Sequence, residues 1–67
     1  MAMLLSEYMS DDGSRQAHVV KTPKGFVVNL YETENGSQQY VRTVDVTEHS
    51  ESYAEDCAEN YVQFIFS

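Results

Sequence analysis

The chain has 67 residues, of which 11 are acidic and 4 basic, so its formal net charge is -7. A chain of this length forms one domain and buries only roughly 60% of its unfolded surface, which makes its stability marginal. Its acidity disfavours direct binding to DNA or RNA, because that binding depends on Lys and Arg side chains that neutralise phosphates. The composition therefore indicates a small soluble domain, and it is compatible with basic protein partners.

Cysteine and histidine are too few for a disulfide framework or a zinc finger. Cys57 is the one cysteine of the chain, and His18 and His49 are its two histidines. An unpaired cysteine suits a reducing compartment. No run approaches the ~18 apolar residues of a membrane span, and the N-terminus lacks the basic leader of a signal peptide. We expect a cytoplasmic protein.

The N-terminal segment has a helical pattern. Residues 2–9 place Leu4, Leu5, Tyr8 and Met9 on one face of a helix. This predicts either a short helix that docks on the domain or an arm that becomes ordered against a partner. Residues 10–14 are a polar connector rich in turn-forming residues. The predicted organisation is an arm or short helix plus connector over residues 1–14, followed by a single domain over residues 15–67.

Three strands follow the connector, over residues 16–21, 26–32 and 38–46. The strongest is FVVNLYE, in which apolar residues alternate between the two faces. Asn35-Gly36 predicts a hairpin, because both residues accept the positive φ angles of a type I′ turn. A two-residue loop pairs Tyr31 with Tyr40 and Leu30 with Val41, whereas a three-residue loop shifts the pairing by one.

The stretch from Glu48 to Phe66 predicts one amphipathic helix, with Ser50 as its N-cap and acidic residues in its first turns. Two adjacent rows of this helix are expected to pack on the sheet: Tyr53, Cys57 and Tyr61, and Ala54, Ala58 and Val62. Its acidic surface, which we expect to face water, consists of Glu51, Glu55, Asp56 and Glu59.

The predicted fold class is α+β, with a three-stranded antiparallel sheet and a C-terminal helix packed on one face. The element order is βββα, or αβββα if the N-terminal segment is helical. A sheet covered on one face only leaves apolar side chains on the other, and such a patch usually marks an interface. The candidate interface residues are Val19, Val27, Tyr31, Tyr40 and Val44, together with Phe64 and Phe66 beyond the helix.

Homodimerisation is the preferred use of this surface, since two-fold self-pairing is the commonest oligomeric arrangement. The alternative is that residues 2–9 fold over the same surface within one chain.

No catalytic, cofactor-binding or metal-binding residues are predicted. Cys57 lies in the middle of the helix on its buried face, where burial makes a thiol unreactive. His18 shares a strand face with Val20 and is expected to be a partly buried histidine with satisfied hydrogen bonds; the alternative is a pH-sensing role. The acidic residues around His49 have the spacing of no known metal motif, and the helix dipole already accounts for them.

Two resemblances to known proteins follow from these elements. The order helix, three strands, helix resembles a double-stranded-RNA-binding domain. The last helix of that domain begins with a basic cluster, whereas this chain reads SESYAED there, so no RNA function is carried over.

The run KGFVVNLYE, a polar hairpin and the run VRTVDVTEHSESYAEDCAENYV, within residues 24–66, resemble small uncharacterised accessory proteins of T4-like phages, cyanophages among them. In those proteins a glycine-led strand pair precedes a helix of the YAEDxAENxV kind, which here spans residues 53–62. The resemblance implies a viral accessory protein, which we would expect in the cytoplasm of the host cell, and no particular activity.

These observations predict a small, acidic, non-enzymatic protein of the phage accessory type. We expect it to act through protein-protein binding as a homodimer, with itself and an unidentified host or viral protein as partners. The alternative is a nucleic-acid mimic that occupies the basic groove of a DNA- or RNA-binding protein with its acidic helix face.

Overall fold

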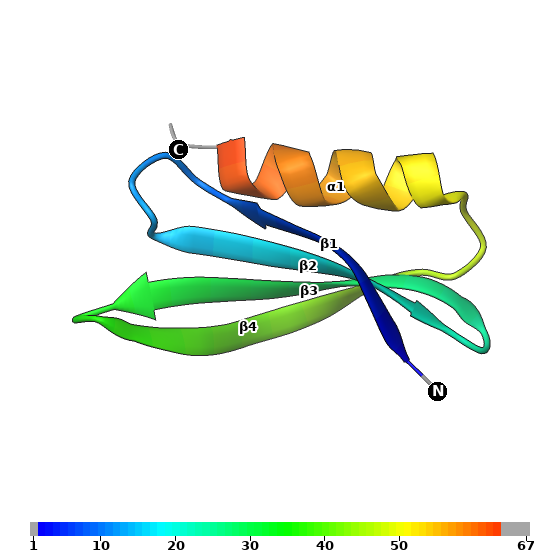
Figure 1. Cartoon of the computed structure of the whole chain (residues 1–67), viewed down its shortest axis with the longest axis horizontal. Helices are drawn as coiled ribbons and strands as arrows, with labels where there is room; N and C mark the ends of the chain where they lie inside the picture. Colours follow the sequence, from blue (N-terminus) through cyan, green and yellow to red (C-terminus); the bar gives the residue numbers. More distant parts are fainter. Residues whose placement is uncertain (1, 64–67) are drawn as a thin grey trace.

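The computed structural model describes residues 2–63 and shows a twisted antiparallel sheet with one helix across one of its faces (Figure 1). Neighbouring strands along the chain are neighbours in the sheet, in the order β1-β2-β3-β4. The elements are β1 (Met3–Met9), β2 (Arg15–Thr22), β3 (Gly25–Glu34), β4 (Ser37–Val46) and α1 (Glu51–Gln63). The α+β class with a C-terminal helix is confirmed, but the described part of the sheet has four strands, so the prediction of three is wrong.

The additional strand is β1, where the sequence pattern predicted a helix or an arm. β1 pairs with β2 along its length, with Leu4 opposite Val20 and Tyr8 opposite Ala17. A bulge at Leu5 interrupts the alternation of side chains between the two faces of the strand. Leu5 is the inserted residue, so the two adjacent leucines both belong to β1. Apolar residues at positions 4, 5, 8 and 9 therefore fit a helical period even though the segment is extended. The structure of this segment is decided by its pairing with β2, which the periodicity within residues 2–9 does not reveal.

The polar segment between β1 and β2 is the turn of a hairpin. The carboxylate of Asp12 accepts hydrogen bonds from the hydroxyls of Ser10 and Ser14, at 2.8 and 2.7 Å, and from the Ser14 backbone N–H at 2.9 Å. These donors lower the pKa of Asp12 to about 2. The Ser10 hydroxyl also accepts the N–H of Arg15 at 3.0 Å, and Ser10 is buried. The segment predicted as a connector therefore fixes the path of β1 back onto the sheet.

The β3–β4 hairpin has the two-residue loop, one of the two alternatives that the sequence left open. Asn35 and Gly36 have φ angles of 54° and 82°, as a type I′ turn requires. Tyr31 lies opposite Tyr40, as that loop predicts. The predicted partner of Leu30 is wrong, because a bulge shifts the register beyond this pair and puts Arg42 opposite Leu30. The inserted residue is Val41.

The link from the sheet to the helix crosses the start of β3 at close range. Gly25 has a φ of 138°, and a Cβ atom at this position would lie 2.6 Å from the backbone oxygen of Thr47. Only glycine satisfies both conditions. The glycine that the sequence pattern assigned to a turn therefore also allows the helix to return over the sheet.

The helix begins at its predicted cap. The N–H of Tyr53 donates to the Ser50 hydroxyl at 3.3 Å, and the N–H of Ala54 donates to the Ser50 carbonyl at 3.1 Å. The predicted helix extends to Phe66, and its last three residues lie outside the described part of the chain.

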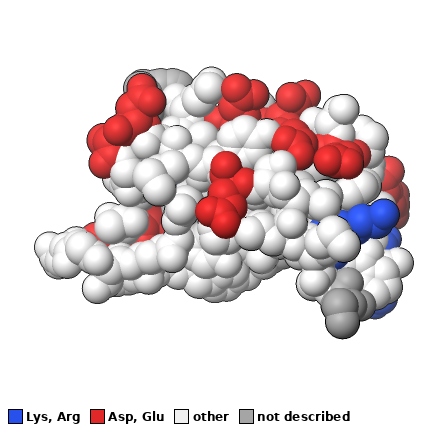
Figure 2. Space-filling model, viewed as in Figure 1, with Lys and Arg blue, Asp and Glu red and all other residues white. Residues whose placement is uncertain are grey.

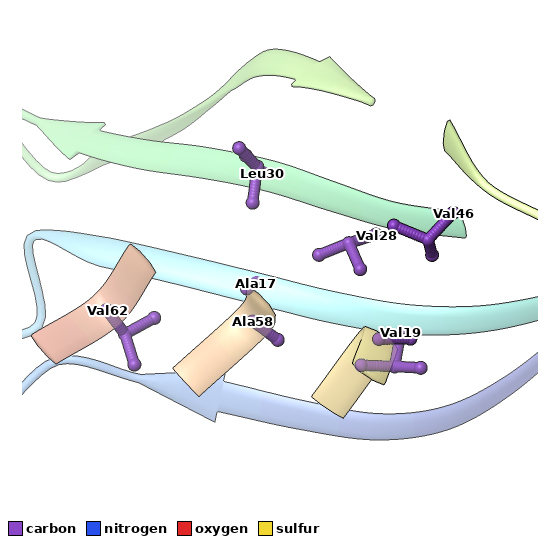
Figure 3. Close-up of a cluster of buried hydrophobic side chains, with 8 residues drawn as sticks. Ala17, Val19, Val28, Leu30, Val46, Ala58 and Val62 are labelled. Atoms are coloured by element: carbon purple, nitrogen blue, oxygen red, sulfur yellow. The ribbon is translucent and has the colours of Figure 1, made fainter. Parts of the chain in front are cut away.

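The core lies between α1 and the sheet, where small helix residues meet valines and a leucine of the strands (Figure 3). Its buried members are Ala17, Val19, Val28, Leu30, Val46, Ala54, Ala58 and Val62. Because Ala54 and Ala58 are completely buried, the helix backbone approaches the sheet closely.

The row of Ala54, Ala58 and Val62 packs on the sheet as predicted, but the row beside it is only partly covered. Tyr53 is 45% exposed, so its predicted place in the core is wrong. Tyr61 is half-buried, and its hydroxyl donates to the carbonyl of Tyr31 on β3 at 3.1 Å. The helix packs on β1, β2 and β3. The hydrogen bond from Tyr61 to Tyr31 shows that the end of the tyrosine row lies on the β3 side of the helix.

Candidate interaction surface on the open sheet face

The sheet face turned away from α1 combines aromatic, apolar and uncharged polar side chains. Strand pairing places on this side the residues that alternate with the buried ones. We call this surface the open face; it consists of Leu4, Glu7, Met9, Gln16, His18, Val20, Val27, Asn29, Tyr31, Tyr40, Thr43 and Asp45. Of these residues only Glu7 and Asp45 are carboxylates, and no Lys or Arg belongs to the set.

A chain of three rings crosses the open face from β2 to β4. The centroids of His18 and Tyr31 lie 4.7 Å apart with the rings tilted by 45°, and Tyr31 meets Tyr40 edge-on at 5.9 Å. Both distances lie in the range of favourable aromatic contacts. Tyr40, at the edge, is 60% exposed, whereas Tyr31 is half-buried between its neighbours. The ring chain therefore holds Tyr40 in a defined position at the surface.

Hydrogen bonds between side chains hold the polar part of the open face. The Tyr40 and Thr43 hydroxyl oxygens lie 2.6 Å apart, and the Thr43 hydroxyl donates to the Asn29 amide oxygen at 2.7 Å. The amide of Gln38 donates to the amide oxygen of Gln16 across β3. Such cross-strand contacts reduce the freedom of the side chains before any partner arrives, which lowers the entropic cost of binding.

His18 has an unpaired buried nitrogen in the middle of this surface. Its Nε2 atom is covered and has no hydrogen-bond partner among the described residues. Its neighbours on the same face are Glu7 on β1, Asn29 on β3 and the Tyr31 ring. The prediction of a partly buried histidine on the face of Val20 is confirmed, but the prediction that its hydrogen bonds are satisfied is wrong for Nε2.

The structure divides the predicted interface residues. Val27, Tyr31 and Tyr40 lie together on the open face, as expected. Val19 is completely buried under the helix, and Val44 is partly buried against the same core, so their predicted exposure is wrong. Alternation excludes Val19 because it lies between His18 and Val20, and the β4 bulge turns Val44 towards the helix side. Phe64 and Phe66 lie outside the described residues.

β1 adds a part of the open face that the sequence pattern did not predict. Leu4 and Met9 are 50% and 60% exposed, and they lie opposite Val20 and Gln16 of β2. The available signal was the run of apolar residues at the N-terminus. The bulge at Leu5 concealed this signal, because a bulge removes the strict alternation by which a strand is recognised in a sequence.

The predicted acidic surface is only partly free. Acidic side chains lie along the helix and at one end of the molecule, while the basic ones visible in this view lie at the other end (Figure 2). Glu51, Asp56 and Glu59 are exposed, but Glu55 is half-buried and contacts β1. Its carboxylate accepts hydrogen bonds from Ser6, at 2.7 Å, and from Tyr8. These bonds lower the pKa of Glu55, and the contact raises that of Tyr8 to about 12.

Among the residues considered for chemistry, Asp45, Glu48 and His49 line one pocket together with Thr47. Cys57 is half-buried on α1, and His49 stacks on Tyr53 at a centroid distance of 3.9 Å. Asp45 accepts the N–H of Thr47 at 3.0 Å, which lowers the pKa of its carboxyl group. Within residues 2–63, no group of three or more His, Cys, Asp or Glu side chains is placed to hold a metal ion.

Comparisons of the chain with protein-family models, with curated proteins and with solved structures find no match. The resemblance to phage accessory proteins therefore stays a prediction. In the described part of the chain, the helix is too short and too polar to cross a membrane.

Proposed function

We propose that this chain is a small non-enzymatic accessory protein of the phage type that binds other proteins through its open face and functions as a homodimer. The observation that carries this proposal is the ring chain of His18, Tyr31 and Tyr40 on a face opposite the described helix. Aromatic side chains supply large contact areas at a small entropic cost, and they are enriched in protein interfaces.

The edges of the sheet are less suited to binding than its open face. Both edge strands carry a bulge near the middle, at Leu5 in β1 and at Val41 in β4. A bulge breaks the row of backbone groups that an added strand would need, and it is a common protection against pairing between edges. We therefore assign the contact to the side chains of the open face.

The distribution of charge favours a second copy as the occupant. Two chains of charge -7 repel each other, so self-association requires that the acidic groups stay apart. The open face has carboxylates only at Glu7 and Asp45 among its twelve residues, and the helix acids lie on the opposite side of the sheet. Packing two open faces together places both helices outside, where water screens them.

The area of the open face is sufficient for a reversible dimer. Four strands about 4.8 Å apart, with about eight residues each at about 3.3 Å per residue, give a face of roughly 500 Å². Two such faces bury about 1,000 Å² in total, which is the lower limit for a specific interface. We therefore expect a dimer that dissociates on dilution.

Nucleic-acid mimicry is supported less well than self-association. A mimic must present its carboxylates to a basic groove, whereas Glu55 is occupied by Ser6 and Tyr8. The remaining helix acids form a shorter row than the one the sequence predicted.

Light scattering coupled to size exclusion, over a wide range of protein concentration, tests the proposal. The wild-type protein should change from dimer to monomer on dilution. Tyr40→Ser should be monomeric at concentrations where the wild type is dimeric, because it removes the exposed end of the ring chain. Tyr53→Ser is the matched control, since Tyr53 is comparably exposed but lies on the helix. A wild type that is monomeric throughout, or equal behaviour of both variants, would contradict the proposal.

A further inference from the structure

A cavity opens at the end of the domain where β1 and α1 both finish. It has a volume of about 280 Å³, and its lining includes Tyr8, Met9 and Asp11 from the β1 side and Glu59 and Val62 from the helix. Sites for drug-sized ligands typically measure about 300–1,000 Å³. A cavity of this size therefore suits one side chain of a partner.

The walls of this cavity have two chemical characters. Met9, Val62 and the Tyr8 ring supply apolar surface, whereas Asp11 and Glu59 are exposed carboxylates. Lysine and arginine have the same division, with an apolar stem and a cationic head. A methionine wall adapts to side chains of different shape, because its thioether chain is flexible.

We propose that this cavity is a second binding site that receives a lysine or arginine side chain from a basic protein partner. The stem packs against Met9 and Val62, and the cationic head lies near the carboxylates of Asp11 and Glu59. The acidic groups of the site do not belong to the open face, whereas its Met9 wall does. The site is therefore tested separately from self-association at Glu59, which lies on the helix.

Two acidic residues near the cavity, Asp12 and Glu55, already have hydrogen-bond partners within the fold, so we do not include them in the site. Asp12 holds the β1–β2 turn through Ser10 and Ser14, and Glu55 ties α1 to β1. Glu59 accepts one hydrogen bond, from the Gln63 amide at 3.1 Å, along the exposed side of the helix. Glu59 and Asp11 therefore remain accessible to a cationic group at the mouth of the cavity.

Charge complementarity extends beyond the cavity. Acidic side chains lie at this end of the molecule and along the helix, and the Lys and Arg residues seen in the same view lie at the opposite end (Figure 2). Arg15 also lies at the cavity end, where its guanidinium donates to the Tyr61 carbonyl of the helix at 3.4 Å and contacts the Tyr61 ring. A basic partner is therefore attracted to the end that contains the cavity, and the attraction should weaken as salt is added. General attraction to an acidic protein needs no defined site. Contact of one lysine or arginine stem with the apolar walls of the cavity is what would make the binding specific.

The test uses acetylated and amidated hexalysine as the probe and follows backbone amide shifts in the full-length, isotope-labelled protein. Binding should shift Met9, Asp11, Glu59 and Val62 more than Glu34, which lies at the β3–β4 hairpin. Hexaglutamate, the control of opposite charge, should produce no shifts. Shifts spread equally over all the acidic residues would overturn the proposal, since they would indicate attraction without a site.

Two matched pairs of variants complete the test. Glu59→Gln should weaken hexalysine binding by about two- to fivefold, whereas Glu34→Gln, with the same change in net charge, should leave it nearly unchanged. Met9→Ala should weaken binding more than Met3→Ala, because both side chains are about equally exposed and only Met9 lines the cavity. Equal effects within either pair would overturn the assignment. Glu59 and Glu34 lie outside the open face, so the result for that pair does not depend on dimerisation. Because Met9 also belongs to the open face, the methionine pair is compared at protein concentrations at which light scattering shows a monomer.

Discussion

The two faces of the same sheet have different side chains and different roles. The covered face consists of valines, alanines and a leucine that pack against α1 until they are almost completely buried. The open face has rings, amides and hydroxyls in contact with one another, and several of them remain exposed. Adjacent residues of one strand, such as Val19 and Val20, belong to different faces. The buried apolar contacts are therefore concentrated on one side of the sheet, and the exposed rings and polar groups are on the other.

The largest effect should come from a charge placed on each face in turn. Val19→Asp puts an unpaired carboxylate in the core and should cost at least about 4 kcal/mol, which unfolds a marginal domain. Val20→Asp should keep the fold, with a loss of about 1 kcal/mol or less, and should weaken self-association. Circular dichroism and urea titration measure both variants. If both variants lost structure equally, Val19 and Val20 would contribute equally to stability, which would contradict the difference between the two faces.

The next effect tests the link that keeps the helix on the covered face. Gly25→Ala combines an unfavourable φ with a Cβ atom 2.6 Å from the Thr47 carbonyl, and it should cost about 2–3 kcal/mol. Gly36→Ala is the control: its φ is also positive, but no heavy atom lies within 4 Å of the added Cβ. It should cost about 1 kcal/mol. If the urea midpoint of Gly25→Ala were higher than that of Gly36→Ala, the segment around Thr47 would be able to move away from the added Cβ atom.

A smaller effect depends on pH and concerns the contact between β1 and α1. The folded-state pKa of Glu55 lies below its ordinary value of 4.5, so its contribution to stability is complete above pH 4.5 and is lost as the pH falls through the folded pKa. The pKa of Tyr8 is raised from 10.0 to about 12, so its contribution is complete below pH 10 and is lost as the pH rises towards 12.

Glu55→Gln should therefore be less stable than the wild type at neutral pH, by less than about 1 kcal/mol, because both groups are only half-buried and solvent still screens them. The difference should shrink as the pH falls below 4.5. Urea unfolding at several pH values measures it, and a difference that is constant with pH would show that the carboxylate charge contributes nothing.

The smallest effect separates the two tyrosines of the helix row. Tyr53→Ala should change the free energy of unfolding by no more than about 0.5 kcal/mol, because Tyr53 is 45% exposed. Tyr61→Ala should cost more, since Tyr61 packs against the core, donates to Tyr31 and lies 5.5 Å from the Arg15 guanidinium. Thermal unfolding ranks the pair; equal losses would mean that the whole row contributes to the core, as the sequence pattern indicated.

Short-range rules predicted the elements whose cause is local. The Asn35-Gly36 turn, the Ser50 cap and the row of Ala54, Ala58 and Val62 depend on backbone preferences and on periodicity within one element. The same reasoning placed Val27, Tyr31 and Tyr40 on one face, because alternation along FVVNLYE and a correct turn determine that part of the hairpin.

Bulges and long-range contacts decided the remaining features. A bulge inserts one residue without a strong local signal, so the N-terminal strand resembled a helix and Val44 was assigned to the wrong face. The pairing of β1 with β2 gives the open face its Leu4 and Met9, and the contact of Glu55 with β1 removes one acid from the expected acidic surface.

The sequence by itself determined the α+β class, the turn of the last hairpin, the capped helix and the net charge of -7. Only the tertiary structure decided the number of strands, the side of the sheet on which each valine lies and which carboxylates are free. The physical reason is that a turn or a cap is stabilised by neighbours within a few residues. The role of a strand residue is fixed by partners far along the chain.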